Sequence, residues 1–206
     1  MIVVVACFRL ETAWIPRGAG VRAVRIRPGA PSGFERAITA EGNPDLLIST
    51  GFCGGLDPQL GTGRLILATE VIHRGRAIAV ASELLARARA ALAREGIVPA
   101  LGRLVTADRV IGRKEEKQRL HTETKALGVE MEAGKLADWA DDNKIPFLAV
   151  KSVLDPAVGE LPLAKVSDAL LHPIAAIDAG FAAIRAGRAI GRGIGALVRE
   201  FAGGEG

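Results

Sequence analysis

The sequence predicts a single α/β domain built on a central, mixed and mostly parallel sheet that is flanked by helices. Apolar runs such as residues 2–6 and 147–153 are typical of buried strands, and stretches with helical character separate them. A chain of 206 residues with 49% hydrophobic content is long enough for one sizeable core. We therefore expect one domain over residues 1–206, with residues 163–206 as a helical C-terminal extension.

The predicted elements alternate between strand and helix along most of the chain. The short helix predicted at residues 34–41 and the alanine-rich helix at residues 82–95, which Ser82 can cap, are two of these helices. Such alternation predicts helices on the faces of a sheet, and ligands in such sheets bind beyond the carboxyl ends of the strands. Strands are expected at residues 2–6, 21–27, 45–50, 64–71, 76–81, 98–105, 126–130 and 147–153, and further helices at residues 113–124 and 133–143.

The start of the chain and its cysteines exclude several classes of protein. The apolar run at residues 2–8 is short and follows no basic segment, so we expect a strand there and neither a signal peptide nor a membrane span. A cytoplasmic location follows from this expectation. Cys7 and Cys53 allow at most one disulfide, and the histidines lack metal-ligand spacing. Neither a metal nor another cofactor is expected.

The charge pattern permits an anionic partner but does not favour nucleic acid. The net charge is +4 and the isoelectric point about 9.4. Aromatic residues make up 4% of the chain and tyrosine is absent, so a stacking platform for single-stranded nucleic acid is not expected.

Acidic residues and glycines follow several of the predicted strands. Glu130 and Glu132 flank Met131 on an extended segment and therefore share one face, where two carboxylates can accept hydrogen bonds from the vicinal hydroxyls of a sugar. An acidic first helical turn is the alternative. Asp155 follows an apolar strand, where burial can raise its proton affinity and make it a general acid, and Glu11 can orient a water. For Asp155 the simpler interpretation is a turn residue before Pro156, and for Glu11 it is a solvated residue that opens a loop.

The glycines after residue 50 form the segment ISTGFCGGL. Because Gly51, Gly54 and Gly55 carry no side chain, backbone amides there can approach a ligand closely. A tight turn is an equally good interpretation, and the spacing of a dinucleotide-binding loop is absent.

Five segments in order resemble the superfamily of purine nucleoside phosphorylases and methylthioadenosine/adenosylhomocysteine nucleosidases. They are ACFRLE, ISTGFCGGL with GTGRLILATEVI, GRLVTADRVIG, GVEMEA and FLAVKSVLD. The resemblance implies an α/β domain that is usually oligomeric and that cleaves the N-glycosidic bond of a nucleoside. It also implies a nucleoside as the partner molecule and a homo-oligomer, a dimer or larger.

The resemblance assigns roles to the marked residues. It implies that Glu132 holds the ribose hydroxyls with Met131 packed on the sugar, that Asp155 protonates or hydrogen-bonds the base, and that Glu11 positions the attacking water. The role of Glu130 is left open. The resemblance also places further residues in the wall of the substrate site, and these are Gly54, Cys53, Val110 and Ile111.

Hydrolysis is favoured over phosphorolysis. The phosphorylases of the superfamily carry a G-D-P-x-R phosphate loop that is absent here, and Glu11 occupies the nucleosidase position; Arg36 is a minor candidate for phosphate binding. Val110 stands where small-substrate nucleosidases place an aromatic ring, and Lys151 stands in place of an arginine. The segment between Ile72 and Ser82 is also short, which predicts an open site that admits a large 5′ group.

The short length, the segment LDPAVGELP and the arginine-bearing tail are similar to the hopanoid-associated branch of the superfamily. This similarity implies removal of adenine from adenosylhopane. Alternatives are cleavage of methylthioadenosine or adenosylhomocysteine, a phosphate-dependent phosphorylase, and a nucleoside-binding relative without turnover. Residues 189–201 form a basic amphipathic helix that can lie on an anionic membrane, although packing on its own domain is the simpler alternative.

Overall fold

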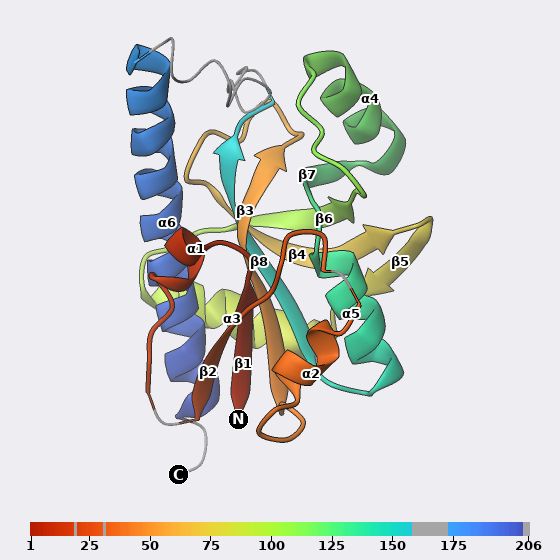
Figure 1. Ribbon diagram of the computed structural model, residues 1–206, viewed down its shortest axis with the longest axis vertical. Coiled ribbons are helices and arrows are strands. Elements are labelled where there is room, and N and C mark those ends of the chain that lie inside the picture. The colour runs from red at the N-terminus through yellow and green to blue at the C-terminus, as the bar shows by residue number, and fades with distance from the viewer. Residues whose placement is uncertain (19, 31, 158–172, 204–206) are drawn as a thin grey trace.

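The computed structural model describes residues 1–18, 20–30, 32–157 and 173–203 and shows an α/β domain, as the sequence predicts (Figure 1). The strands are β1 Ile2–Ala6, β2 Val21–Arg25, β3 Leu46–Gly55, β4 Leu65–His73, β5 Arg76–Ala79, β6 Ala100–Thr106, β7 Ala126–Glu130 and β8 Phe147–Asp155. The helices are α1 Arg9–Thr12, α2 Phe34–Ile38, α3 Ser82–Arg94, α4 Lys114–Thr124, α5 Ala133–Asp142 and α6 Pro173–Ala202.

The sheet is mixed and mostly parallel, which confirms the prediction. Among the described residues its strand order is β2-β1-β3-β7-β6-β4-β5, and β8 pairs with both β3 and β4. Since β3 and β4 are also joined through β7 and β6, these five strands close into a ring. Antiparallel pairing occurs between β3 and β7, β4 and β5, and β4 and β8.

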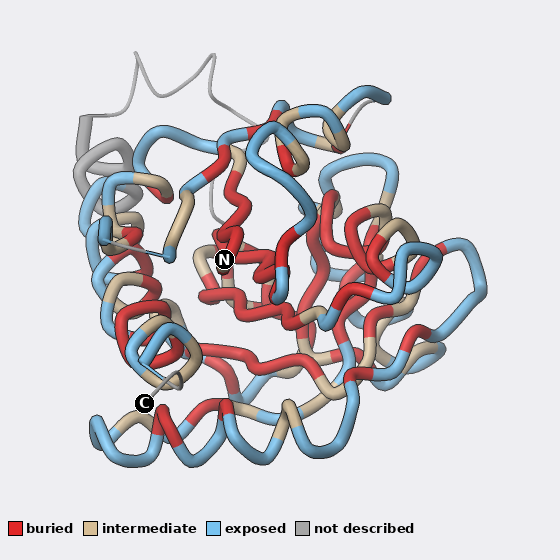
Figure 2. The backbone as a smooth tube through the Cα atoms, turned by 90° about the horizontal axis from the view of Figure 1, so that it is seen from below, coloured by how far each residue is buried: buried red, intermediate tan, exposed pale blue. Residues whose placement is uncertain are grey.

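Helices cover the two faces of this sheet. One core cluster joins β1, β3 and β8 to α3 and α6, and another joins β1 and β3 to α2 and α5. Figure 2 shows the buried strands enclosed by helices that are exposed on their outer sides. The carboxyl ends of β1, β3, β7 and β8 carry the acidic residues and glycines that the sequence marked.

The glycine segment is part of a strand, so the prediction of a loop there was wrong. β3 continues to Gly55 because β8 pairs with it in parallel up to Asp155, while Gly54 and Gly55 also pair with β7. A Cβ at Gly55 would lie 3.1 Å from Val153 Cγ1, and a Cβ at Gly54 would lie 3.3 Å from Val129 Cγ1. These glycines therefore allow neighbouring strands to approach β3 closely.

Two local features differ from the predictions. α3 has Ala81 as its N-cap, without a side-chain capping bond, so the predicted cap at Ser82 was wrong. The short helix α1, which no apolar periodicity announced, follows β1 and turns Glu11 back into the protein.

The apolar face of α6 belongs to the protein core. Ile190, Ile194 and Leu197 are fully buried in the cluster that also contains α3 and β8 residues. This face packs on its own domain, as the simpler of the two interpretations predicts, and is not available to a lipid surface. Residues 158–172, which include most of LDPAVGELP, lie outside the described residues. Within the described part of the chain, no helix has the length and hydropathy needed to cross a membrane.

Candidate active site

Glu130 ends β7 and is held on all sides by protein donors. Its Oε1 accepts a hydrogen bond from the Thr106 hydroxyl, and its Oε2 accepts from the backbone N–H groups of Glu132 (3.0 Å) and Ala133 (2.7 Å). The Lys151 ammonium lies 3.2 Å from the same Oε2. Burial by itself raises the pKa of Glu130, but Lys151 and these hydrogen bonds outweigh it and hold the pKa below its ordinary value.

Glu132 is the residue that precedes α5, and its surroundings differ from those of Glu130. Its Oε1 accepts a hydrogen bond from the Gly29 N–H (2.9 Å), and the Cys7 thiol also contacts it. Burial raises the pKa of Glu132; Lys151 opposes this rise and the charge of Glu130 adds to it. The expected grip of one diol by both carboxylates therefore does not hold, because protein donors already occupy Glu130.

Lys151 is the cation that interacts with both Glu130 and Glu132. It is buried on β8 and donates a hydrogen bond to the Thr50 carbonyl (3.0 Å) in addition to its pairing with Glu130. Burial alone lowers the pKa of Lys151, but Glu130 and Glu132 raise it above its ordinary value. Lys151 therefore remains an ammonium at neutral pH and neutralises part of the acidic charge.

Glu11 is buried and bound by backbone N–H groups. Its Oε2 accepts from Cys7 (2.9 Å) and Phe8 (2.8 Å), and its Oε1 accepts from Phe52 on β3 (2.8 Å). Gly51 makes room for this carboxylate, since a Cβ there would lie 2.7 Å from Glu11 Oε1. The helical turn of α1 thus directs the Glu11 carboxylate toward β3. Glu11 is therefore not the solvated loop residue of the alternative interpretation.

Asp155, the last residue of β8, is paired with Gly54 of β3 and faces a lysine. Lys117 Nζ from α4 lies 2.5 Å from Asp155 Oδ2. The sequence led us to expect an apolar environment that raises proton affinity, but the structure places a buried cation there. Phe52, which binds Glu11, precedes Gly54 by two residues, so β3 connects Glu11 to Asp155 over about 7 Å of strand.

The remaining residues that the sequence assigned to the substrate site differ in their burial. Cys53 is buried in a core cluster, and burial raises the pKa of its thiol to about 12, so it packs as a small apolar side chain. Ile111 packs beside Val105 and Val129, whereas Val110 is 65% exposed on the segment before α4. Met131 is half-buried between the two glutamates.

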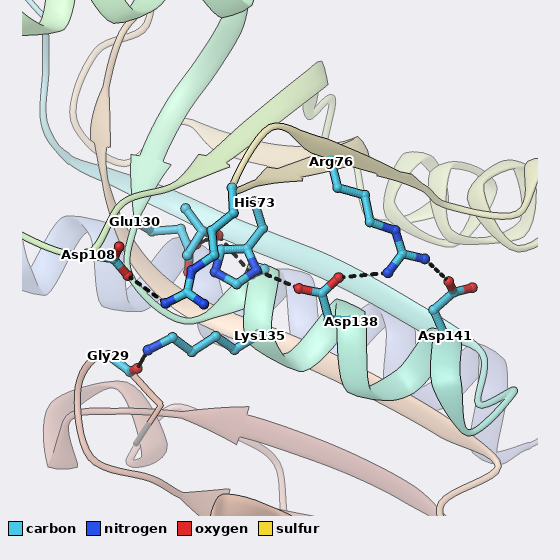
Figure 3. A network of polar contacts seen from close by, with 11 residues as sticks. Gly29, His73, Arg76, Asp108, Glu130, Lys135, Asp138 and Asp141 are labelled. Carbon is cyan, nitrogen blue, oxygen red and sulfur yellow. Dashed lines mark hydrogen bonds and ion pairs between the residues drawn. The ribbon is translucent and has the colours of Figure 1, made fainter. Parts of the chain in front are cut away.

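A second polar network fixes the start of α5 and the segment that contacts Glu132. The Lys135 ammonium donates a hydrogen bond to the Gly29 carbonyl oxygen. The N–H of the same Gly29 donates to Glu132 Oε1. Farther along α5, Asp138 contacts both His73 and Arg76 (Figure 3). Among the described residues, no group of three or more His, Cys, Asp or Glu side chains is placed to hold a metal ion.

Comparison with known proteins identifies the family. The family described as the phosphorylase superfamily matches residues 28–179 of the 206-residue chain. The chain belongs to the phosphorylase superfamily.

Relatives within the phosphorylase superfamily include nucleosidases. The 5′-methylthioadenosine/S-adenosylhomocysteine nucleosidase of Staphylococcus epidermidis is 29% identical over 136 residues, which cover 57% of this chain and 60% of that protein. The chain thus matches less than two thirds of the length of this relative. The Helicobacter pylori 5′-methylthioadenosine/S-adenosylhomocysteine nucleosidase with butyl-thio-DADMe-Immucillin-A has a TM-score of 0.77 at 18% identity, and both chains are covered to 97%. The futalosine hydrolase of Helicobacter pylori has a TM-score of 0.74 at 19% identity, also covered to 97% on each side.

Sequence reasoning missed residues that contact the carboxylates of the candidate site. Lys117 lies in a polar helix and Thr106 ends a strand, and neither is marked by its neighbours in the sequence. The sequence marks Lys151 as standing in place of an arginine, but it does not predict the pairing of Lys151 with Glu130. An isolated lysine inside the apolar run of β8 was the available signal, because a charge on a buried strand requires a partner.

Proposed function

We propose that this protein is a purine nucleosidase that releases adenine from a 5′-substituted adenosine of the methylthioadenosine or adenosylhomocysteine type. The observation that carries the proposal is the position of Glu11, Glu132 and Asp155 around the ends of β1, β7, β8 and β3, each with different partners. Three carboxyl groups with distinct environments can perform distinct steps of one reaction.

Each carboxyl group has a role that its environment supports. Glu132 accepts hydrogen bonds from the ribose hydroxyls, for which an ionised carboxylate offers acceptors only. Asp155 serves the leaving base, whose departure becomes easier when the ring nitrogen gains a proton. Glu11, fixed by backbone N–H groups, aligns the water that attacks C1′.

Water is the proposed nucleophile. The sequence has no G-D-P-x-R phosphate loop, and Glu11 would repel a phosphate placed beside it. The nucleosidases and the futalosine hydrolase among the relatives support hydrolysis in this part of the superfamily.

A bulkier 5′ group is the second candidate. β4 ends at His73 and β5 begins at Arg76, so that the connecting turn consists of Arg74 and Gly75. So short a hairpin leaves no insertion to cover the sugar, which favours a large substituent such as the hopane of adenosylhopane. The C-terminal helix gives no support for a lipid substrate, because the apolar face of α6 is buried in the domain.

The test is adenine release from a panel of nucleosides. The purified protein is incubated with adenosine, 5′-methylthioadenosine, S-adenosylhomocysteine and a 5′-lipidated adenosine, with and without phosphate, and adenine is measured by chromatography. We expect phosphate-independent release, and the fastest substrate identifies the 5′ group. Release that requires phosphate would make the protein a phosphorylase. Binding without release from any of the four would contradict the proposal and leave a nucleoside-binding protein.

A further inference from the structure

Helix α4 buries a lysine at a position where helices ordinarily bury apolar residues. The structure describes α4 in full, and within this helix the buried residue is Lys117, whose side chain is 1% exposed. Burying an ammonium is costly even when it is paired, and well-packed apolar residues often stabilise a fold as well or better. Attachment of α4 to the domain therefore does not explain why a lysine is used.

The contacts of Lys117 all lie at the end of β8. Its Nζ is 2.5 Å from Asp155 Oδ2 and 3.3 Å from each of the carbonyl oxygens of Asp155 and Pro156. These acceptors match the three donors of an ammonium group. Gly54 of β3 lies alongside, since a Cβ there would be in ordinary van der Waals contact with Lys117 Cε at 3.8 Å. The lysine is thus fixed on the carboxyl group that the proposed reaction uses for its acid step.

We propose that Lys117 is a positioning residue of the acid step, which holds Asp155 at the leaving base and supplies the proton that Asp155 passes on. The inference rests on the proposed function and deepens it. A carboxylate that is ion-paired at rest has no proton of its own to give, and the paired ammonium at 2.5 Å is a proton source within hydrogen-bond distance.

The proton balance of this step is complete. As the bond between C1′ and the purine N9 breaks, its electron pair goes to the base. Lys117 gives a proton to Asp155 and Asp155 gives a proton to the base, so that Lys117 ends neutral and Asp155 ends as the carboxylate it was. The water that adds to C1′ loses a proton to Glu11. Exchange with solvent then removes this proton from Glu11 and returns one to Lys117.

The test compares a base that needs a proton with one that does not. In 5′-methylthioadenosine the base must gain a proton as it leaves, whereas in its N7-methylated derivative the base leaves as a neutral molecule. We expect Lys117→Met to lower kcat on the first substrate by about 10²–10³-fold and to change kcat on the second by less than about 5-fold. Lys114→Met removes an exposed lysine from the same helix and is expected to match the wild type on both.

Two further variants keep the test independent of folding. Lys117→Met with Asp155→Asn leaves no unpaired charge, and its loss on 5′-methylthioadenosine should equal that of Asp155→Asn alone, because both residues serve one step. Equal losses by Lys117→Met on both substrates, or no loss on either, would overturn the inference while leaving the nucleosidase proposal in place. If the wild type cleaves neither substrate, the proposed function fails and the inference fails with it.

Discussion

Glu130 and Glu132 are two residues apart and similarly buried, yet their electrostatic environments are opposite. Glu130 receives hydrogen bonds from Thr106 and from backbone N–H groups and pairs with Lys151, and its pKa is lowered. Glu132 receives the Gly29 N–H, and burial raises its pKa. Protein donors occupy both oxygens of Glu130, whereas Oε1 of Glu132 accepts the Gly29 N–H and the carboxyl group keeps acceptor sites for a ligand. The comparison supports a structural role for Glu130, and within the proposed function it favours Glu132 as the residue that binds substrate.

The largest effect is expected from Glu130→Gln. This change leaves the buried Lys151 without its closest charge partner, and breaking a buried pair costs about 3–5 kcal/mol of the free energy of unfolding. Denaturant titration measures the loss. Glu70→Gln, which removes the partner of Arg103 in a surface pair, serves as the control, with an expected cost below about 1 kcal/mol. A similar loss in the free energy of unfolding for the two variants would contradict the structural role of Glu130.

Glu132→Gln should affect activity and not stability. A glutamine can still accept the Gly29 N–H but loses the charge that binds ribose hydroxyls, and hydrogen bonds to charged groups contribute about 1.5–3 kcal/mol each. We expect kcat/KM for adenine release to fall by about 100-fold, while the thermal midpoint at neutral pH stays equal or rises. A variant that unfolds more easily and keeps its activity would reverse the assignment of the two glutamates.

A third carboxylate, Glu11, can be compared with Glu130 and Glu132 by changing Gly51, the glycine against which it packs. Gly51 has φ of +122°, and a Cβ there would lie 2.7 Å from Glu11 Oε1. Gly51→Ala is expected to cost about 1–3 kcal/mol of stability because of backbone strain, and to lower kcat by displacing Glu11. Gly61→Ala is the matched control, because a Cβ there meets nothing within 4 Å; its expected change is within about 0.5 kcal/mol. An unchanged kcat in Gly51→Ala would separate Glu11 from the reaction.

The smallest effect is a difference in pH dependence. The pKa of Glu130 is lowered, so its stabilising contribution is full above its ordinary value of 4.5 and is lost as the pH falls below that value. The pKa of Glu132 is raised, so its contribution is present below 4.5 and is lost as the pH rises. Thermal melts between pH 3 and 7 should therefore show the deficit of Glu130→Gln shrinking in acid, and any advantage of Glu132→Gln growing toward neutral pH. Parallel behaviour of the two variants would contradict the comparison.

The sequence predicted the fold class and most strands because apolar runs report burial directly. It did not predict that β3 continues through Gly55, since glycines signal a turn locally and only the pairing with β7 and β8 makes them a strand. The amphipathic pattern of α6 was read correctly as a helix, but a pattern cannot say whether its apolar face meets a membrane or the core.

The sequence predicted the acidic residues of the candidate site, but it did not predict the groups that bind them. Glu11, Glu132 and Asp155 follow predicted strands, and their position at the sheet edge followed from the topology of such sheets. The division of labour between Glu130 and Glu132 depends on Thr106, Gly29 and other donors distant in the chain. Long-range contacts of this kind leave no periodic signal in the sequence.

Adenine formation from 5′-methylthioadenosine in phosphate-free buffer, by the wild type and by Asp155→Asn, tests the central claim most directly. The account predicts steady release by the wild type and a rate about 10²–10⁴-fold lower for Asp155→Asn, with the fold of both checked by circular dichroism. Equal rates would show that Asp155 does not serve the leaving base. Release by the wild type only after phosphate is added would show that water is not the nucleophile.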